Sequence, residues 1–392
     1  YDRVGPNAEI VARRITSLAR LALGGRKEPT IVLATVNAVL QRVPPREFLR
    51  RQLRPIAPGQ RLDRDGLIQR LQQAGFVRTG TAMEPGEFAV RGGIVDLYPP
   101  GRLSPVRLDF FGDQLESIKS FDAETQRTTK PVQKLVLMPI SEVAFGEAAE
   151  RLFRQKYVAT FGAVTASDPL YEAVSSGQRY MGLEHWLAFF HTGLETLLDY
   201  IGDASISLDH LAEDTARHRF EQVEEHYAAR VDSLETSAFG APPYKPVPPK
   251  EMFIDKAGWE RMLATNLVRR FSPFETDEGG ARRRSFRGRP GRSFAAERQN
   301  ADVNLFEALA GHIKSQQARG RRVIVAGWTN GARERLGALL ADHGMPGAKK
   351  VQSLAEALIV PKDTVTLAVI ELEQGFEAPD LDMPPEAPDE AD

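Results

Sequence analysis

Apolar residues near the N-terminus recur every three or four positions. Val11, Ile15 and Leu18 follow this spacing with arginines between them, which is typical of an amphipathic helix. Residues 30–36 then read TIVLATV, and a continuous apolar and β-branched run predicts a strand covered on both faces. The two prolines of NAVLQRVPP end the next segment. Residues 1–60 are therefore predicted to form part of an α/β domain.

The pattern changes to short alternating runs between residues 61 and 142. LDRDGLIQRLQQAGF predicts a short helix, and short strands separated by turn residues follow from Phe88 to Phe121. This arrangement predicts a small α+β domain with mostly antiparallel strands. Helical spacing returns over residues 143–270, above all in a long one-sided helix with an apolar stripe, formed by Phe220, Val223, Tyr227, Val231 and Leu234.

The C-terminal part of the chain alternates between order and low complexity. Residues 271–300 are rich in arginine and glycine and have little to bury, so they predict a linker. Helical and strand-like runs then alternate over residues 301–381, which predicts a small α/β domain with parallel strands. The acidic, proline-rich residues 382–392 are expected to be disordered. The predicted fold class is therefore an α/β multidomain chain.

Composition narrows the classes of protein. At 392 residues, with 42% hydrophobic and 27% charged residues, the chain suggests two to four globular domains. The net charge of −2 gives no whole-chain attraction to nucleic acid or to a membrane, so any nucleic-acid role must be local. The absence of cysteine excludes disulfides and thiolate chemistry and fits a reducing cytoplasm. No signal-like start or membrane-spanning run is present.

Signatures of catalysis are missing. A phosphate-binding loop of the GxxxxGK[ST] type needs a Gly-Lys pair, and none occurs in this chain. The seven histidines show no metal-ligand spacing, and there is no GxSxG motif. We therefore predict no catalytic residue, no metal and no cofactor. The chain starts at Tyr1 and not at a methionine, from which we expect a preceding segment.

One stretch is locally basic. Residues 282–292 read RRRSFRGRPGR, and arginines with an interleaved phenylalanine can contact a phosphate backbone and stack on a base. A charged linker kept in solution by its arginines is the alternative, and the residues favour it because no scaffold is evident. The candidate DNA-binding residues are Arg282, Arg283, Arg284, Arg287, Arg289 and Arg292.

The most informative stretch is SPVRLDFFGDQLESIKSFD. Its Gly112-Asp113 pair lies between alternating runs, which predicts a hairpin with a two-residue turn. Strand alternation puts Arg107, Asp109 and Phe111 on one face, and Val106, Leu108 and Phe110 on the face that enters the core. A two-residue loop also sets Asp109 opposite Glu116. That like-charge pair is unfavourable unless cations such as Arg107 and Arg91 offset it.

This polar face has two interpretations. Arginines and an aromatic ring among polar residues are typical of the anchors of a protein interface. In that interpretation Arg91, Arg107 and Phe111 contact the partner, while Asp109 and Glu116 hold the arginines. The alternative is a solvated sheet face with an ordinary ladder of charges and an incidentally exposed phenylalanine. On the residues alone, the second interpretation is favoured.

Long ordered stretches of the chain resemble a known family. They are YDRVGPNAEIVARR, IVLATVNAVLQRVPP, EFAVRGGIVDLYPPG, PVRLDFFGDQLESIKSFDAETQRT and the later GRRVIVAGWTNGARERLGALL and ELEQGFEAPDL. These look like the N-terminal part of the bacterial transcription-repair coupling factor, Mfd, which is itself similar to the excision-repair helicase UvrB. The likeness extends up to Leu381, after which the sequence departs from the family.

The resemblance implies a function. In the family, the second small domain docks the damage-recognition ATPase UvrA, and Arg91, Arg107 and Phe111 match part of that surface. Gly92 and Gly93 would allow close backbone geometry. The family's first UvrB-like module lacks a working nucleotide loop, and its ATP-dependent DNA translocase and its RNA polymerase-binding domain lie further along.

The resemblance therefore implies a cytoplasmic, non-catalytic recruitment module for nucleotide-excision repair. The partner would be UvrA, with RNA polymerase and DNA as further partners of the full-length family and no membrane. The alternative is a UvrB-type ATP-dependent DNA helicase whose nucleotide loop lies upstream of this chain.

Overall fold

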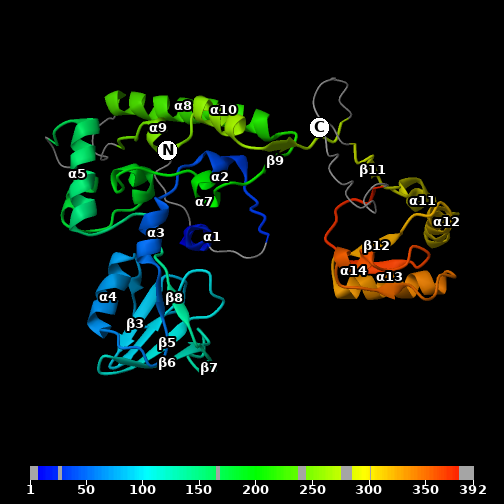
Figure 1. Ribbon diagram of the computed structural model, residues 1–392, viewed down its shortest axis with the longest axis horizontal. Coiled ribbons are helices and arrows are strands. Elements are labelled where there is room, and N and C mark those ends of the chain that lie inside the picture. The colour runs from blue at the N-terminus through cyan, green and yellow to red at the C-terminus, as the bar shows by residue number, and fades with distance from the viewer. Residues whose placement is uncertain are drawn as a thin grey trace, which may run out of the picture. The chain divides into compact units, whose positions relative to one another are not determined.

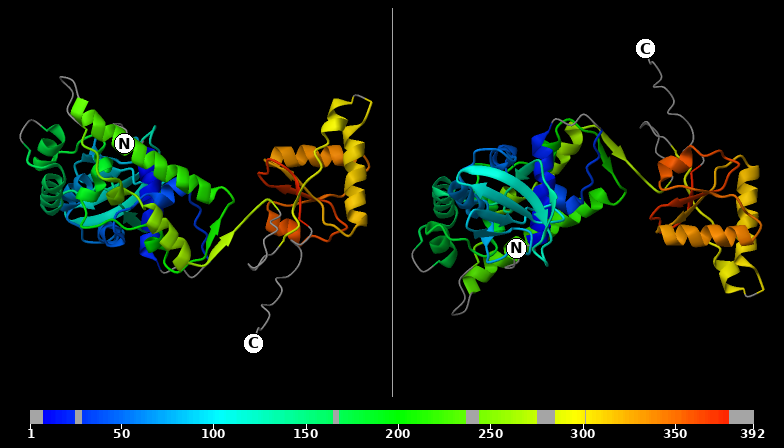
Figure 2. Two further views of the ribbon diagram at one scale, coloured as in Figure 1. Left: turned by 90° about the horizontal axis from the view of Figure 1, so that it is seen from above. Right: turned by 90° about the horizontal axis from the view of Figure 1, so that it is seen from below.

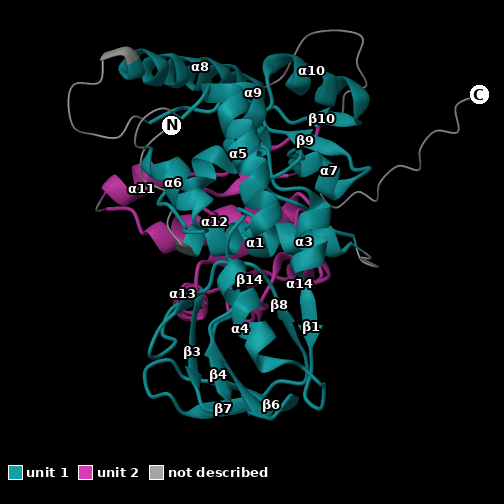
Figure 3. Cartoon of the chain, turned by 90° about the vertical axis from the view of Figure 1, so that its left-hand side faces the viewer, with its two compact units in different colours: residues 1–273 teal, residues 274–392 magenta. Residues whose placement is uncertain are grey.

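The computed structural model describes residues 8–24, 29–164, 168–236, 244–274, 285–300 and 302–378. The chain divides into two compact units, Tyr1–Pro273 and Phe274–Asp392 (Figure 3). Each unit has its own buried apolar clusters, so each is described by itself.

The first unit combines helices with several small sheets. Its helices are α1 Ala8–Leu23, α2 Val36–Leu40, α3 Arg46–Gln52, α4 Arg64–Gln73, α5 Glu147–Phe161, α6 Pro169–Ser175, the 3-10 helix η1 Leu183–Phe189, α7 Leu197–Ile201, α8 Ala212–Thr236, α9 Pro249–Met252 and α10 Lys256–Thr265. Its strands are β1 Arg54–Ile56, β2 Val77–Arg78, β3 Glu87–Arg91, β4 Ile94–Leu97, β5 Val106–Phe111, β6 Gln114–Phe121, β7 Thr128–Pro131, β8 Leu135–Leu137, β9 Ile206–Leu208 and β10 Val268–Arg270.

Two of the predicted helices are confirmed. In α1, Ile15 and Leu18 are buried, as the spacing of apolar residues requires. The long helix α8 runs across the top of the first unit (Figure 1). Its predicted apolar stripe is buried at Val223 and half-buried at the other positions, which are Phe220, Tyr227, Val231 and Leu234.

The strand predicted for TIVLATV is wrong. Residues 29–35 form neither helix nor strand, and Thr35 caps the N-terminus of α2. Ile31 and Leu33 are 87% and 91% exposed. Among the described residues no strand pairs with this run, and an apolar β-branched sequence becomes a strand only when a neighbour supplies the hydrogen-bonded ladder.

A six-stranded sheet with the order β2-β3-β4-β5-β6-β7 dominates residues 77–131, and its pairs are antiparallel except β2 with β3. The alternating runs thus form strands where the sequence predicts them. One face packs on α4 around a core that includes Leu67, Phe88 and Leu108. Viewed from below, this sheet lies in front of the helices of the first unit (Figure 2).

The short antiparallel pair of β1 and β8 carries the chain into and out of this sheet region. The rest of the first unit has an aromatic-rich cluster around Phe153, Tyr157 and Trp186. The structure is therefore a mixed α/β fold, as predicted. The finer domain boundaries stay a prediction.

The second unit contains the predicted parallel strands. Its elements are β11 Arg289–Pro290, α11 Ala295–Gln299, α12 Leu305–Ala318, β12 Ile324–Gly327, α13 Asn330–Asp342, β13 Lys349–Lys350, α14 Leu354–Leu358, β14 Thr366–Val369 and β15 Phe376–Glu377. The parallel strands take the order β12-β14-β13. Part of the predicted linker is ordered as β11 and α11, and the predicted acidic tail, residues 382–392, lies outside the described residues. None of the described helices is long and apolar enough to cross a membrane.

Candidate partner-docking surface

The hairpin predicted at Gly112-Asp113 is present. Phe111 pairs with Gln114 across a two-residue turn, and Gly112 has a φ of +60°. A glycine with positive φ at the first turn position is what a type II′ hairpin requires. The predicted faces are also correct. Val106, Leu108 and Phe110 are buried in the core, whereas Phe111 is 77% exposed.

The predicted pairing of Asp109 with Glu116 is wrong. The register shifts between Asp109 and Phe110, so that Phe110 pairs with Leu115 and Asp109 pairs with Ser117. Glu116 is the extra residue of this bulge and is exposed. Because Glu116 is the extra residue, the cross-strand partner of Asp109 is Ser117 and not Glu116.

A second tight turn joins β3 to β4. Arg91 pairs with Ile94 across Gly92 and Gly93, and Gly92 has a φ of +57°. A Cβ on Gly93 would lie 2.6 Å from the carbonyl oxygen of Phe110. The expectation that these glycines allow close backbone geometry is therefore correct, and the close approach places the two hairpin turns at the same end of the sheet.

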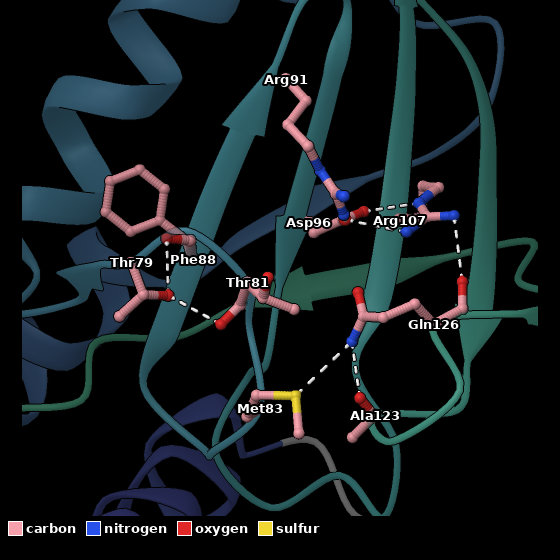
Figure 4. A network of polar contacts seen from close by, with 9 residues as sticks. All are labelled: Thr79, Thr81, Met83, Phe88, Arg91, Asp96, Arg107, Ala123 and Gln126. Carbon is pink, nitrogen blue, oxygen red and sulfur yellow. Dashed lines mark hydrogen bonds and ion pairs between the residues drawn. The ribbon is translucent and has the colours of Figure 1, made fainter.

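The carboxylate that holds the arginines is Asp96 in β4. Its side chain is 1% exposed. Its Oδ1 accepts a hydrogen bond from Nε of Arg107 at 2.7 Å, and its Oδ2 accepts one from Nη2 of Arg107 at 2.9 Å. Nη2 of Arg91 also donates to Oδ2 at 2.7 Å. Figure 4 shows the three side chains converging from neighbouring strands. The holding role predicted for Asp109 and Glu116 thus falls to Asp96 instead.

Sequence reasoning missed Asp96, although a signal existed. Asp96 is the single carboxylate within the apolar strand Ile94–Leu97. Strand alternation and the two-residue turn put it on the same face as Arg91, and it pairs directly with Arg107. A buried carboxylate is expected to recruit cations, because an unpaired charge in the interior is costly.

Arg107 is largely covered, with its side chain 21% exposed. Its guanidinium carbon lies 4.9 Å from the ring centre of Phe121, and Nη1 donates to the carbonyl oxygen of Gln126 at 3.4 Å. The hydrogen bond with Asp96 raises the pKa of Arg107 above its usual value, and the charges of Asp96 and Asp109 add to this. In this structure the guanidinium of Arg107 is thus engaged within its own fold, and the contact of Arg107 with a partner stays a prediction.

The remaining predicted residues are accessible. The Arg91 side chain is 52% exposed, and among the described residues Asp96 is the partner of its guanidinium. Asp109 is half-buried. We call the surface formed by Arg91, Arg107, Asp109, Phe111 and Glu116 the docking face. Its centre is a fixed charge cluster, and its edge is an exposed aromatic ring.

The Arg-rich run is only partly described. Arg282, Arg283 and Arg284 lie outside the described residues. The other three candidate positions are exposed: Arg287 has a φ of +49°, Arg289 pairs in β11 with Glu377 of β15, and Arg292 forms an ion pair with Glu297. DNA binding by this run stays a prediction.

Other buried charges have structural partners. Asp168 accepts hydrogen bonds from the Tyr157 hydroxyl at 2.5 Å and from Lys245 at 2.9 Å. Glu142 accepts a hydrogen bond from Nε of Arg14 at 2.5 Å. In the described part of the chain, no group of three or more His, Cys, Asp or Glu side chains is placed to hold a metal ion.

Comparison with known proteins bears on this surface. Residues 55–143, which contain the docking face, match the family model of the UvrB interaction domain. The transcription-repair-coupling factor of Escherichia coli (strain K12) is 32% identical over 271 residues, covering 67% of this chain and 23% of that protein. The factor of Myxococcus xanthus is 30% identical over 406 residues, which cover 96% of this chain and 32% of that protein.

The predicted resemblance to the N-terminal region of the transcription-repair-coupling factor is confirmed. The similarity to the factor of Rickettsia bellii (strain RML369-C) covers 97% of this chain at 25% identity. This chain spans from 19% to 32% of the length of the relatives it matches. The comparisons therefore describe one region of a longer kind of protein.

Proposed function

We propose that this chain is a non-catalytic recruitment module of a transcription-coupled DNA repair factor and that it binds UvrA through the docking face. The match of residues 55–143 to the UvrB interaction domain supports an interaction role for this region. The names of the relatives support a place in transcription-coupled repair. RNA polymerase and DNA would be partners of the longer protein.

The observation that carries the proposal is the exposure of Phe111. The ring is 77% exposed although both hairpins beside it are fixed by tight turns and cross-strand hydrogen bonds. Arg91 lies on the same sheet face and is half-exposed. An exposed aromatic residue with a nearby guanidinium is the usual composition of an interface anchor, in which the ring fills a pocket of the partner.

A binding role also fits the chemistry of the chain. The sequence has no Gly-Lys pair for a nucleotide loop. The buried carboxylates described above are bonded to arginine, lysine or tyrosine side chains, which is how a fold satisfies buried charges. We therefore assign no ATP hydrolysis to these residues.

Titration of purified UvrA into this chain tests the proposal, with Phe111→Ala as the variant. Losing an anchor of this kind typically costs about 2 kcal/mol, so we expect binding to weaken about 30-fold. The matched control is Leu103→Ala. Leu103 is 100% exposed and lies in the β4–β5 connection, at the opposite end of the sheet from the two tight turns.

The control variant should bind like the wild type. Equal affinity of wild type and Phe111→Ala, or no binding by the wild type, would contradict the proposal. Equal losses in both variants would show a general effect of exposed apolar residues and would also contradict it.

A further inference from the structure

We infer that Asp96 is the positioning residue of the docking face: it anchors the guanidinium of Arg91 for an acidic group of the partner, while Arg107 neutralises the buried carboxylate. This inference rests on the proposed function, because it concerns how the same surface is prepared for binding. It assigns the two arginines different roles.

The two arginines are bonded unequally. Arg107 places Nε and Nη2 on the two oxygens of Asp96, in the bidentate geometry that makes arginine–carboxylate pairs strong. It is also held by Phe121 and by the carbonyl of Gln126. Arg91 contributes one bond, from Nη2, and is more exposed, at 52% against 21% for Arg107. Arg107 is therefore the fixed partner and Arg91 the accessible one.

Charge balance explains why two cations are useful here. A carboxylate buried to this extent must be paired, and the bidentate bond from Arg107 provides the pairing. Within the trio of Asp96, Arg91 and Arg107, Arg91 is then the surplus cation. Asp109 lies close enough for its charge to act on Arg107, but among the described residues it is not bonded to Arg91. Arg91 can keep this bond through Nη2 and offer its other N–H groups to a second carboxylate. The partner chemistry that fits this surplus is a carboxylate beside an apolar pocket.

The backbone that carries Arg91 is fixed as well. Nη1 of Arg64, at the start of α4, donates to the carbonyl oxygen of Gly92 at 2.8 Å. The carbonyl oxygen of Gly93 accepts a hydrogen bond from the backbone N–H of Phe110 at 2.9 Å. With the turn held by these bonds and the guanidinium held by Asp96, Arg91 is ordered before binding. Ordering a long side chain at an interface weakens binding about three- to tenfold, and the anchor removes this cost.

A double-mutant cycle tests the inference. Asp96→Asn keeps the size of the side chain and removes its charge, and Arg91→Ala removes the side chain that the anchor holds. In titrations with purified UvrA we expect Asp96→Asn alone to weaken binding about three- to tenfold. In the Arg91→Ala background the same change should alter affinity less than about twofold, because the anchor acts through Arg91.

A control separates positioning from stability. Asp168→Asn also removes a buried carboxylate bonded to a cation, Lys245, but lies outside residues 55–143. We expect it to lower the melting temperature without weakening binding to UvrA. Equal losses of binding for Asp96→Asn in the wild-type and Arg91→Ala backgrounds would overturn the inference and leave Asp96 with a structural role.

Side-chain NMR of the arginines provides a readout that does not need UvrA. In the wild type we expect the Arg107 Hε to exchange slowly with water and the Arg91 guanidinium to rotate slowly, and Asp96→Asn should speed both about tenfold or more. If Asp96→Asn left the exchange of the Arg107 Hε and the rotation of the Arg91 guanidinium unchanged, the inferred role of Asp96 would be wrong even if the chain binds UvrA. If the wild type failed to bind UvrA but the NMR changes occurred, the proposed function would fail and the anchor would stand.

Discussion

Replacing Arg107 with alanine should destabilise the sheet region, because the side chain neutralises a buried charge. The change removes two charge-assisted hydrogen bonds to Asp96 and the contact with Phe121. Breaking a fully buried ion pair from one side costs about 3–5 kcal/mol. Arg107 is 21% exposed and Arg91 still bonds Asp96, so we expect a smaller loss than for a fully buried pair, about 2–3 kcal/mol.

Thermal unfolding followed by circular dichroism measures this loss. For a unit of this size, about 2–3 kcal/mol corresponds to a fall of roughly 5–10 °C in the melting temperature. Phe111→Ala is the control, since an exposed ring should change stability by no more than about 0.5 kcal/mol. The two variants thus separate a structural residue from a contact residue on the same strand.

A compensating variant sharpens the test. In the Arg107→Ala background, Asp96→Ala removes the carboxylate left with a single partner, so part of the lost stability should return, about 1–2 kcal/mol. Reduced UvrA binding with a wild-type melting curve for Arg107→Ala would refute the reasoning. It would mean that the Arg107 fork points outward in solution.

Three further changes test other parts of the structure. Gly93→Ala should lower the free energy of unfolding measured in urea by about 2 kcal/mol, because the added Cβ would lie 2.6 Å from the Phe110 carbonyl oxygen. A Gly93→Ala variant as stable as the wild type would contradict this close approach. Leu33→Lys should change the free energy of unfolding by no more than about 0.5 kcal/mol and should reduce aggregation measured by light scattering, because Leu33 is exposed. A loss of stability above about 1 kcal/mol would mean that Leu33 is buried in solution. Burial lowers the pKa of His191, so the unfolded chain binds more protons near and below pH 6.5 and stability should fall as the pH drops through this range. His191→Gln should flatten this dependence in unfolding curves measured from pH 7.5 to 5.5, and an unchanged slope would contradict it.

The docking face shows how far the residues alone lead. Alternation and the Gly112-Asp113 pair were enough to predict the hairpin and the exposure of Phe111, because turn chemistry and strand period act over a few neighbouring positions. The bulge at Glu116 could not be predicted in this way. It depends on how β6 fits β5 and the rest of the sheet, and one extra residue changes which side chains face each other.

The sequence by itself determined the local elements: the amphipathic α1, the one-sided α8 and the strands between Phe88 and Phe121. Only the tertiary structure decided the burial of Asp96, the unequal bonding of its two arginines and the exposure of Leu33. The physical reason is that periodicity and turn residues act within one segment. Burial of a charge and completion of a strand depend on groups that other segments bring alongside.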